Sequence, residues 1–166
     1  MRWTKLIVLA FVLSWLSACS ESSVEPAVNT ERAILEAAVR YEITSIDTAF
    51  VEFFTLAVMT DVTAGELSRA ELHAPPSWLV DRLRAVPLPY RAYEQCAIGV
   101  GGVSHADFAG AGWLVWTASV TITGNASAIV YAGYFFAGLG AKGELLQLKR
   151  EDGFWRVWRA STMWIS

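Results

Sequence analysis

The chain has 166 residues, enough for one folded domain, and carries 13 basic and 16 acidic side chains. A mildly acidic chain without clustered Lys and Arg lacks the electrostatic footprint of a nucleic-acid-binding protein, so that class is excluded. Hydrophobic residues make up 54% of the sequence, which is enough apolar surface for a buried core.

The first 18 residues predict an export signal. Arg2 and Lys5 precede an apolar run from Leu6 to Leu16, and the small residues Ser17 and Ala18 follow it. That run would rise only about 16 Å as a helix, whereas a membrane span needs about 20 residues. The run is therefore too short for a stable transmembrane helix and typical of a signal peptide.

The stretch Leu16-Ser17-Ala18-Cys19 resembles the lipobox of bacterial lipoproteins. The resemblance implies that residues 1–18 are removed and that Cys19 is lipidated on its sulfur, so that acyl chains hold the mature protein at a membrane. An ordinary secretory peptide cut near Ala18 is the alternative. Ser20, where an Asp would signal retention at the inner membrane, favours the periplasmic face of the outer membrane in a host that has one. We therefore expect a lipid-anchored protein of the bacterial cell envelope.

The mature chain starts with a polar segment and then a helix. Residues 19–29 hold Cys19 and a polar, proline-containing stretch without apolar period, which predicts a flexible tether. From residue 30 a single α+β domain is expected to extend to residue 166. A helix over residues 30–43 opens it, because Ile34, Ala38 and Tyr41 share one apolar stripe.

The next part of the chain is less regular. Residues 48–60 are dense in β-branched and aromatic residues, which favours a strand, although periodicity alone does not exclude a helix. A short helix is expected within residues 75–86, because the two prolines at its start are tolerated there. Residues 87–96 predict an extended path. Residues 98–113 contain five glycines and predict a mobile loop or a glycine-kinked strand.

Four strand-like runs complete the chain, over residues 113–123, 127–138, 143–151 and 153–166. Asp152-Gly153 between the last two is a strong hairpin signal. The expected fold is α+β, with the N-terminal helix packed on a curved antiparallel sheet of four to five strands. Strict alternation in the last strand gives two faces that both mix apolar and polar residues, so we expect both faces of the sheet to be partly covered.

Residues 131–166 resemble the C-terminal signature of a group of uncharacterised bacterial proteins, with a weaker match back to Trp78. The signature runs from a strand with Tyr134 through Gly138-Leu139 to Asp152-Gly153-x-Trp155-x-Val157 and a terminal Trp-Ile-Ser. The layout of one helix followed by long antiparallel strands is also similar to NTF2-like and cystatin-like folds. Those folds include both enzymes and pure binding modules, so the resemblance implies a fold and no particular activity.

Few residues suggest chemistry. His105 and Asp107 lie two apart, and in an extended segment the carboxylate could orient the imidazole as an acid–base pair; an ordinary solvated loop is the alternative. Cys96 with His105 could form a nucleophile pair, but a lone cysteine is more often a small buried apolar residue. No closely spaced set of metal ligands is present, and residues 99–103 lack the strand and helix of a dinucleotide fingerprint, so no metal or cofactor is expected.

Aromatic side chains of the sheet are the candidate ligand-binding residues: Trp113, Trp116, Tyr131, Tyr134 and Trp158. They could line a pocket with a few polar tips, although core packing also explains them. The favoured interpretation is a non-enzymatic envelope lipoprotein that binds a small apolar ligand or another envelope protein. The alternatives are a small-molecule enzyme of NTF2-like type that uses His105 and Asp107, and a purely structural envelope component.

Overall fold

The computed structural model describes residues 24–46, 50–59, 72–136 and 140–165. The predicted signal peptide, the lipobox cysteine and residues 20–23 lie outside this part of the chain. The chain divides into two units, residues 1–30 and 31–166. In the first unit the structure describes residues 24–30, which are helical. The second unit contains the sheet and is described below.

Helix α2 spans Val24–Thr44 and so begins six residues before the predicted start. This corrects the expectation of an irregular tether over residues 24–29. Pro26 stands in the first turn, where its missing N–H has no intrahelical acceptor to lose and its fixed φ suits the helix. From Glu31 onward the helix follows the predicted stripe, with Ile34 and Ala38 fully buried.

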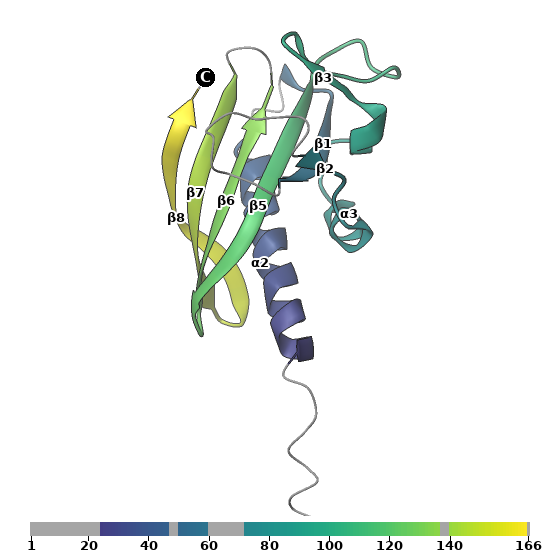
Figure 1. Ribbon diagram of the computed structural model, residues 1–166. Helices are drawn as coiled ribbons and strands as arrows, with labels where there is room; N and C mark the ends of the chain where they lie inside the picture. The colour runs from purple at the N-terminus through teal and green to yellow at the C-terminus, as the bar shows by residue number, and fades with distance from the viewer. Residues whose placement is uncertain (1–23, 47–49, 60–71, 137–139, 166) are drawn as a thin grey trace, which may run out of the picture. The chain divides into compact units, whose positions relative to one another are not determined.

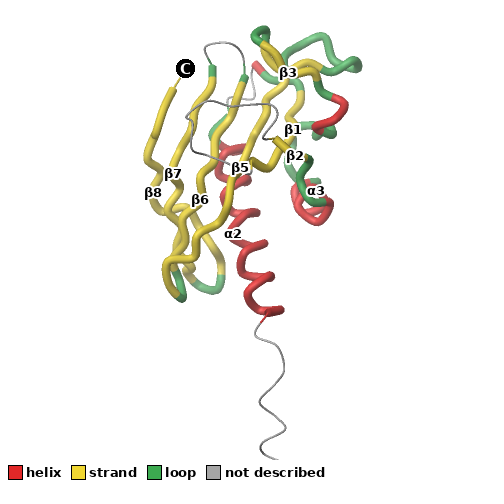
Figure 2. The backbone as a smooth tube through the Cα atoms, viewed as in Figure 1, coloured by secondary structure: helices red, strands yellow, loops and turns green. Residues whose placement is uncertain are grey.

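Within the described residues, eight strands form one open sheet (Figures 1 and 2): β1 Phe53–Met59, β2 Leu72–His73, β3 Ala97–Gly99, β4 Gly102–Ser104, β5 Gly112–Gly124, β6 Ser127–Phe135, β7 Ala141–Glu151 and β8 Phe154–Ile165. Their order is β2-β1-β5-β6-β7-β8, while β4 pairs with β5 and β3 with β4. The α+β class and the mostly antiparallel sheet are confirmed. The expected count of four to five strands is wrong, because β1 pairs in parallel with β5 and the short strands β2, β3 and β4 were not foreseen.

Strand β1 settles the ambiguity over residues 48–60, since Phe53–Met59 is extended. Phe53 and Phe54 point to opposite faces of the sheet, and both are 0% exposed. A strand covered on both faces shows no alternation of apolar and polar residues, which explains why its periodicity was uninformative.

The predicted turn at Asp152-Gly153 joins β7 to β8. Asp152 has φ 51° and Gly153 has φ 83°, the left-handed conformation that two-residue hairpin turns need at both central positions. The glycine-rich stretch forms the short β3–β4 hairpin followed by a loop into β5. Gly112 begins β5 with its Cα against the ring of Phe53, so a side chain at this position would overlap that ring.

The core lies on both faces of the sheet. On one face α2 and the short helix α3, Ser77–Leu83, cover β1, β5, β6, β7 and part of β8 (Figure 1). On the other face Trp116 and Leu114 pack with Tyr93 of the 3-10 turn Tyr93–Gln95. Every residue of these buried clusters follows Glu31, so a chain that starts at Ser20 keeps the whole described core, and we expect it to fold without the leader. Among the described helices, none has the length and apolar character needed to cross a bilayer.

Candidate functional site

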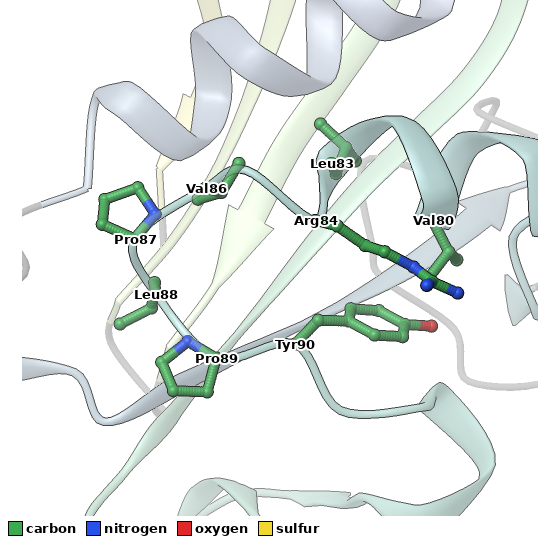
Figure 3. A pocket seen from close by; sticks show the side chains of 8 residues that line it. All are labelled: Val80, Leu83, Arg84, Val86, Pro87, Leu88, Pro89 and Tyr90. Carbon is green, nitrogen blue, oxygen red and sulfur yellow. The ribbon is translucent and has the colours of Figure 1, made fainter.

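A pocket of about 450 Å³ lies between the end of α3 and the proline-containing segment that follows it (Figure 3). We call it the Tyr90 pocket. Six of its lining residues are apolar: Val80, Leu83, Val86, Pro87, Leu88 and Pro89. The other two, Arg84 and Tyr90, carry polar groups and extend in the same direction beside Val80. An apolar wall with a few polar groups is the usual composition of small-molecule sites, whose volumes run from about 300 to 1,000 Å³.

Backbone hydrogen bonds to β1 hold Tyr90 in place. The N–H of Phe54 donates to the carbonyl oxygen of Pro89 at 2.9 Å, and the N–H of Arg91 donates to the carbonyl oxygen of Phe54 at 2.8 Å. The two rings of Phe54 and Tyr90 meet edge to face, with centroids 5.6 Å apart. The extended path predicted over residues 87–96 is therefore found around Tyr90, where it is bonded to the sheet and fixes one wall of the pocket, whereas Tyr93–Gln95 form a 3-10 turn instead.

The polar groups of the Tyr90 pocket complement an acceptor or an anion. Burial, followed by the charges of Glu94 and Cys96, raises the pKa of Tyr90 to about 12, so its hydroxyl keeps its proton at neutral pH. Arg84 Nη2 lies 2.8 Å from Oδ1 of Asp81. Because a guanidinium carries five N–H donors, that exposed ion pair leaves donors for a ligand oxygen.

A second hollow of about 620 Å³ adjoins the first and shares Tyr90 with it. We call it the His105 hollow, because His105 and Asp107 both line it. The imidazole packs against the rings of Phe53 and Phe108, with both centroid distances at 5.9 Å. The candidate acid–base pair therefore faces a hollow, but its histidine side chain is only 9% exposed.

The hydrogen bonding of His105 differs from that of an acid–base pair. The backbone N–H of Asp107 donates to Nδ1 of His105 at 3.1 Å, while the carboxylate Oδ2 lies 3.8 Å from the same nitrogen. Because Nδ1 accepts this bond, the neutral ring carries its proton on Nε2, away from the carboxylate. Cys96, the other candidate, is buried, and burial raises the pKa of its thiol, which holds it in the neutral form and not as the thiolate that a nucleophile requires.

The five aromatic candidates lie at three separate places. Trp113 and Tyr134 share the helix-covered face, with ring centroids 4.3 Å apart. Trp116 and Tyr131 belong to the opposite face, where Trp116 stacks on Trp164 at 6.3 Å. Trp158 is half-exposed on β8. They therefore do not line one pocket, and the Tyr90 pocket contains none of them.

Register shifts in the β7–β8 pairing explain part of this dispersal. One shift falls between Gln147 and Leu148 and the other between Gly143 and Glu144. Each leaves one residue of β8 unpaired in the register: Trp158 and Met163. Each extra residue resets the alternation of the strand. The strict alternation expected for the last strand is therefore wrong over residues 159–162. The second shift restores it, and Trp164 packs against the core on the face opposite Trp155, as the alternation predicts.

A buried charged cluster between α2 and the sheet was missed from the sequence. Glu42 is 0% exposed, and neither oxygen of its carboxyl has a hydrogen-bond partner among the described residues. Burial, and then the charge of Glu144, raises the pKa of Glu42 to about 8, while Lys142 opposes this. Lys142 Nζ lies 2.7 Å from Oε1 of the buried Glu144. The sequence pattern does indicate a buried carboxyl here, because Glu42 continues the four-residue spacing of Ile34 and Ala38 on the apolar stripe.

Two findings bear on the identity of the protein. In the part of the chain that the structure describes, no three His, Cys, Asp or Glu side chains are grouped so as to hold a metal ion. Compared with known proteins, the chain matches no protein family, no curated sequence and no solved structure. A proposal for its function must therefore be argued from its own geometry.

Proposed function

We propose that this protein is a lipid-anchored binding module of the bacterial envelope that holds a small apolar molecule in the Tyr90 pocket. The supporting observation is the pocket itself, which offers about 450 Å³ lined by six apolar residues and two hydrogen-bonding side chains. An apolar molecule with one anionic or acceptor group fits this composition, because its body would be shielded by the prolines and leucines while Arg84 and Tyr90 bind its polar end.

Anchoring through Cys19 is the second part of the proposal. It is supported by the lipobox-like sequence and by the short apolar leader before it. We also propose that the fold is of the NTF2-like or cystatin-like kind, which is supported by one long helix packed on a long antiparallel meander. The proposed role does not depend on that fold assignment.

The binding site can be tested with a probe of matching chemistry, anilinonaphthalene sulfonate, whose fluorescence rises on entry into an apolar site. Residues 20–166 are titrated with the probe, and we expect saturable binding at one site. Val80→Trp places a large ring in the pocket and should weaken binding by at least about tenfold, the loss expected when a site of this kind is filled. Arg84→Ala should weaken it less, because it removes only the partner of the sulfonate.

Two matched variants test whether a loss of binding comes from unfolding and whether it is specific to the Tyr90 pocket. Ala85→Trp adds the same ring at an exposed neighbouring position that does not line the pocket, and should bind the probe like the wild type. His105→Ala changes the adjoining hollow and should also leave binding unchanged. Unchanged binding in Val80→Trp would show that the probe binds elsewhere, and equal loss in Val80→Trp and Ala85→Trp with melting curves unchanged would show that the loss does not come from filling the pocket; either result would overturn the proposal.

A further inference from the structure

The outward face of the β7–β8 hairpin carries a patch of exposed cations and aromatic rings. We call it the hairpin patch; its members are Lys149, Phe154, Arg156, Trp158 and Arg159, all of them exposed. Phe154 is 69% exposed and Trp158 is 50% exposed, so two large aromatic side chains face solvent on the same strand.

Strand pairing places these side chains on one face. Lys149 pairs with Arg156, and Gln147 pairs with Arg159, so the three cations lie in neighbouring rows. The ammonium group of Lys149 lies 4.1 Å from the ring centroid of Trp158. The helix-side residues of the same strands are instead Leu148, Trp155 and Val157, which pack with α2. The hairpin patch is therefore turned away from the helix.

Charge distinguishes this hairpin from the rest of an acidic protein. From Trp113 to Ser166 the sequence holds five Lys and Arg residues against three Asp and Glu residues, although the whole chain has 13 against 16. Lys142 is paired with buried Glu144, so the remaining excess of positive charge lies on the hairpin. Basic side chains mixed with exposed aromatic rings are the combination that attracts a protein to anionic lipid headgroups and lets rings enter the interface.

The hairpin lies at the end of the sheet where the chain enters the folded unit. Ile34, one turn after Glu31, shares a buried cluster with Leu148 and Trp155, which lie within four residues of the β7–β8 turn. Eleven residues, 20–30, lie between Cys19 and Glu31 in the sequence. Even fully extended, a segment of that length reaches only about 40 Å. If Cys19 is lipidated, as proposed above, this end of the sheet stays within reach of the membrane.

We propose that the hairpin patch docks on an anionic phospholipid surface. The cations bind headgroup phosphates, and the rings of Phe154 and Trp158 insert among the glycerol and upper acyl groups. The contact orients the folded unit on the membrane, with the sheet edge β8 toward the lipid.

Vesicle co-sedimentation tests this docking without the acyl anchor. Residues 20–166 are mixed with vesicles of phosphatidylglycerol and phosphatidylethanolamine, and separately with vesicles of phosphatidylcholine. We expect binding to the anionic vesicles that weakens as salt is added. Lys149→Gln with Arg156→Gln should weaken it about fivefold per cation, or roughly 25-fold together. Trp158→Ser should weaken it with both cations intact.

The control removes two positive charges outside the hairpin patch. Arg32→Gln with Arg82→Gln changes two exposed arginines on α2 and α3 and should bind vesicles within about twofold of the wild type if attraction is local. Equal binding to both kinds of vesicle, equal losses in the two double variants, or binding of a nucleic acid or a protein in the absence of vesicle binding would each overturn the proposal. Probe binding in the Tyr90 pocket is measured on the same variants, so failure of docking and failure of the proposed function are distinguishable.

Discussion

Replacing Glu42 by glutamine is expected to remove most of the pH dependence of stability between pH 5 and pH 8. The carboxyl of Glu42 is fully buried without a hydrogen-bond partner among the described residues, and its pKa is raised from 4.5 to about 8 by burial and by Glu144. The folded state therefore favours the protonated acid, whereas the unfolded chain ionises freely. The stability that this carboxyl contributes is therefore fully present below pH 4.5 and is lost as the pH rises through about 8.

The size of the loss follows from the two pKa values. A full separation between 4.5 and about 8 corresponds to on the order of 5 kcal/mol at high pH. Between pH 5 and pH 8 the expected loss is about 3 to 4 kcal/mol, because the unfolded carboxyl is already partly ionised at the lower pH. The tyrosine, cysteine and lysine groups with shifted pKa start from 9.0 or above and are raised, so they contribute little in this window.

Urea unfolding at pH 5 and pH 8 measures this difference. Glu42→Gln should lose little stability across the range, while Glu31→Gln, at an exposed position of the same helix, should lose as much as the wild type. A buried amide without partners lowers the stability of the variant, but it does so equally at both pH values. The difference in stability between pH 5 and pH 8 is therefore unaffected. An equal loss of unfolding free energy between pH 5 and pH 8 in the wild type and in Glu42→Gln would refute the account of this carboxyl.

Two further predictions concern packing and use denaturant unfolding at one pH. Gly133→Ala should lower stability by about 1–3 kcal/mol, because the new Cβ would overlap the backbone of β7 and the ring of Trp116, whereas Gly99→Ala meets nothing and should change little. Trp155→Ala should cost about 3–5 kcal/mol, since Trp155 is 8% exposed, whereas Phe154→Ala at the exposed neighbouring position should cost less than about 0.5 kcal/mol. Equal losses of stability in Gly133→Ala and Gly99→Ala, or in Trp155→Ala and Phe154→Ala, would contradict the packing assigned to these positions.

Features encoded by neighbouring residues could be predicted. The meander from β5 to β8 follows from strand-forming runs separated by turn residues, and Asp152-Gly153 specifies its last hairpin by local geometry. Features that depend on distant residues could not. The parallel pairing of β1 with β5 joins segments more than fifty residues apart, and both faces of β1 are buried, so its sequence contains no period that reveals a partner.

The candidate site depends on such distant pairing. A short helix was expected within residues 75–86 and an extended segment over residues 87–96, but the pocket exists because Pro89 and Arg91 pair with Phe54 of β1. The bulges that expose Trp158 and Met163 also follow from pairing with β7 and leave no mark on the alternation of the sequence. Glu42 was predictable in part, since a carboxyl on an apolar stripe indicates a buried charge.

The most direct test of the proposed function is native mass spectrometry of the full protein purified gently from its own host. We predict a noncovalent addition in the small-molecule mass range that is present in the native spectrum, disappears on denaturation and is absent from Val80→Trp but retained in Ala85→Trp. The denatured mass reads any covalent lipid on Cys19 separately. A native mass equal to the denatured mass, or an addition that survives in Val80→Trp, would contradict the assignment of the Tyr90 pocket as the ligand site.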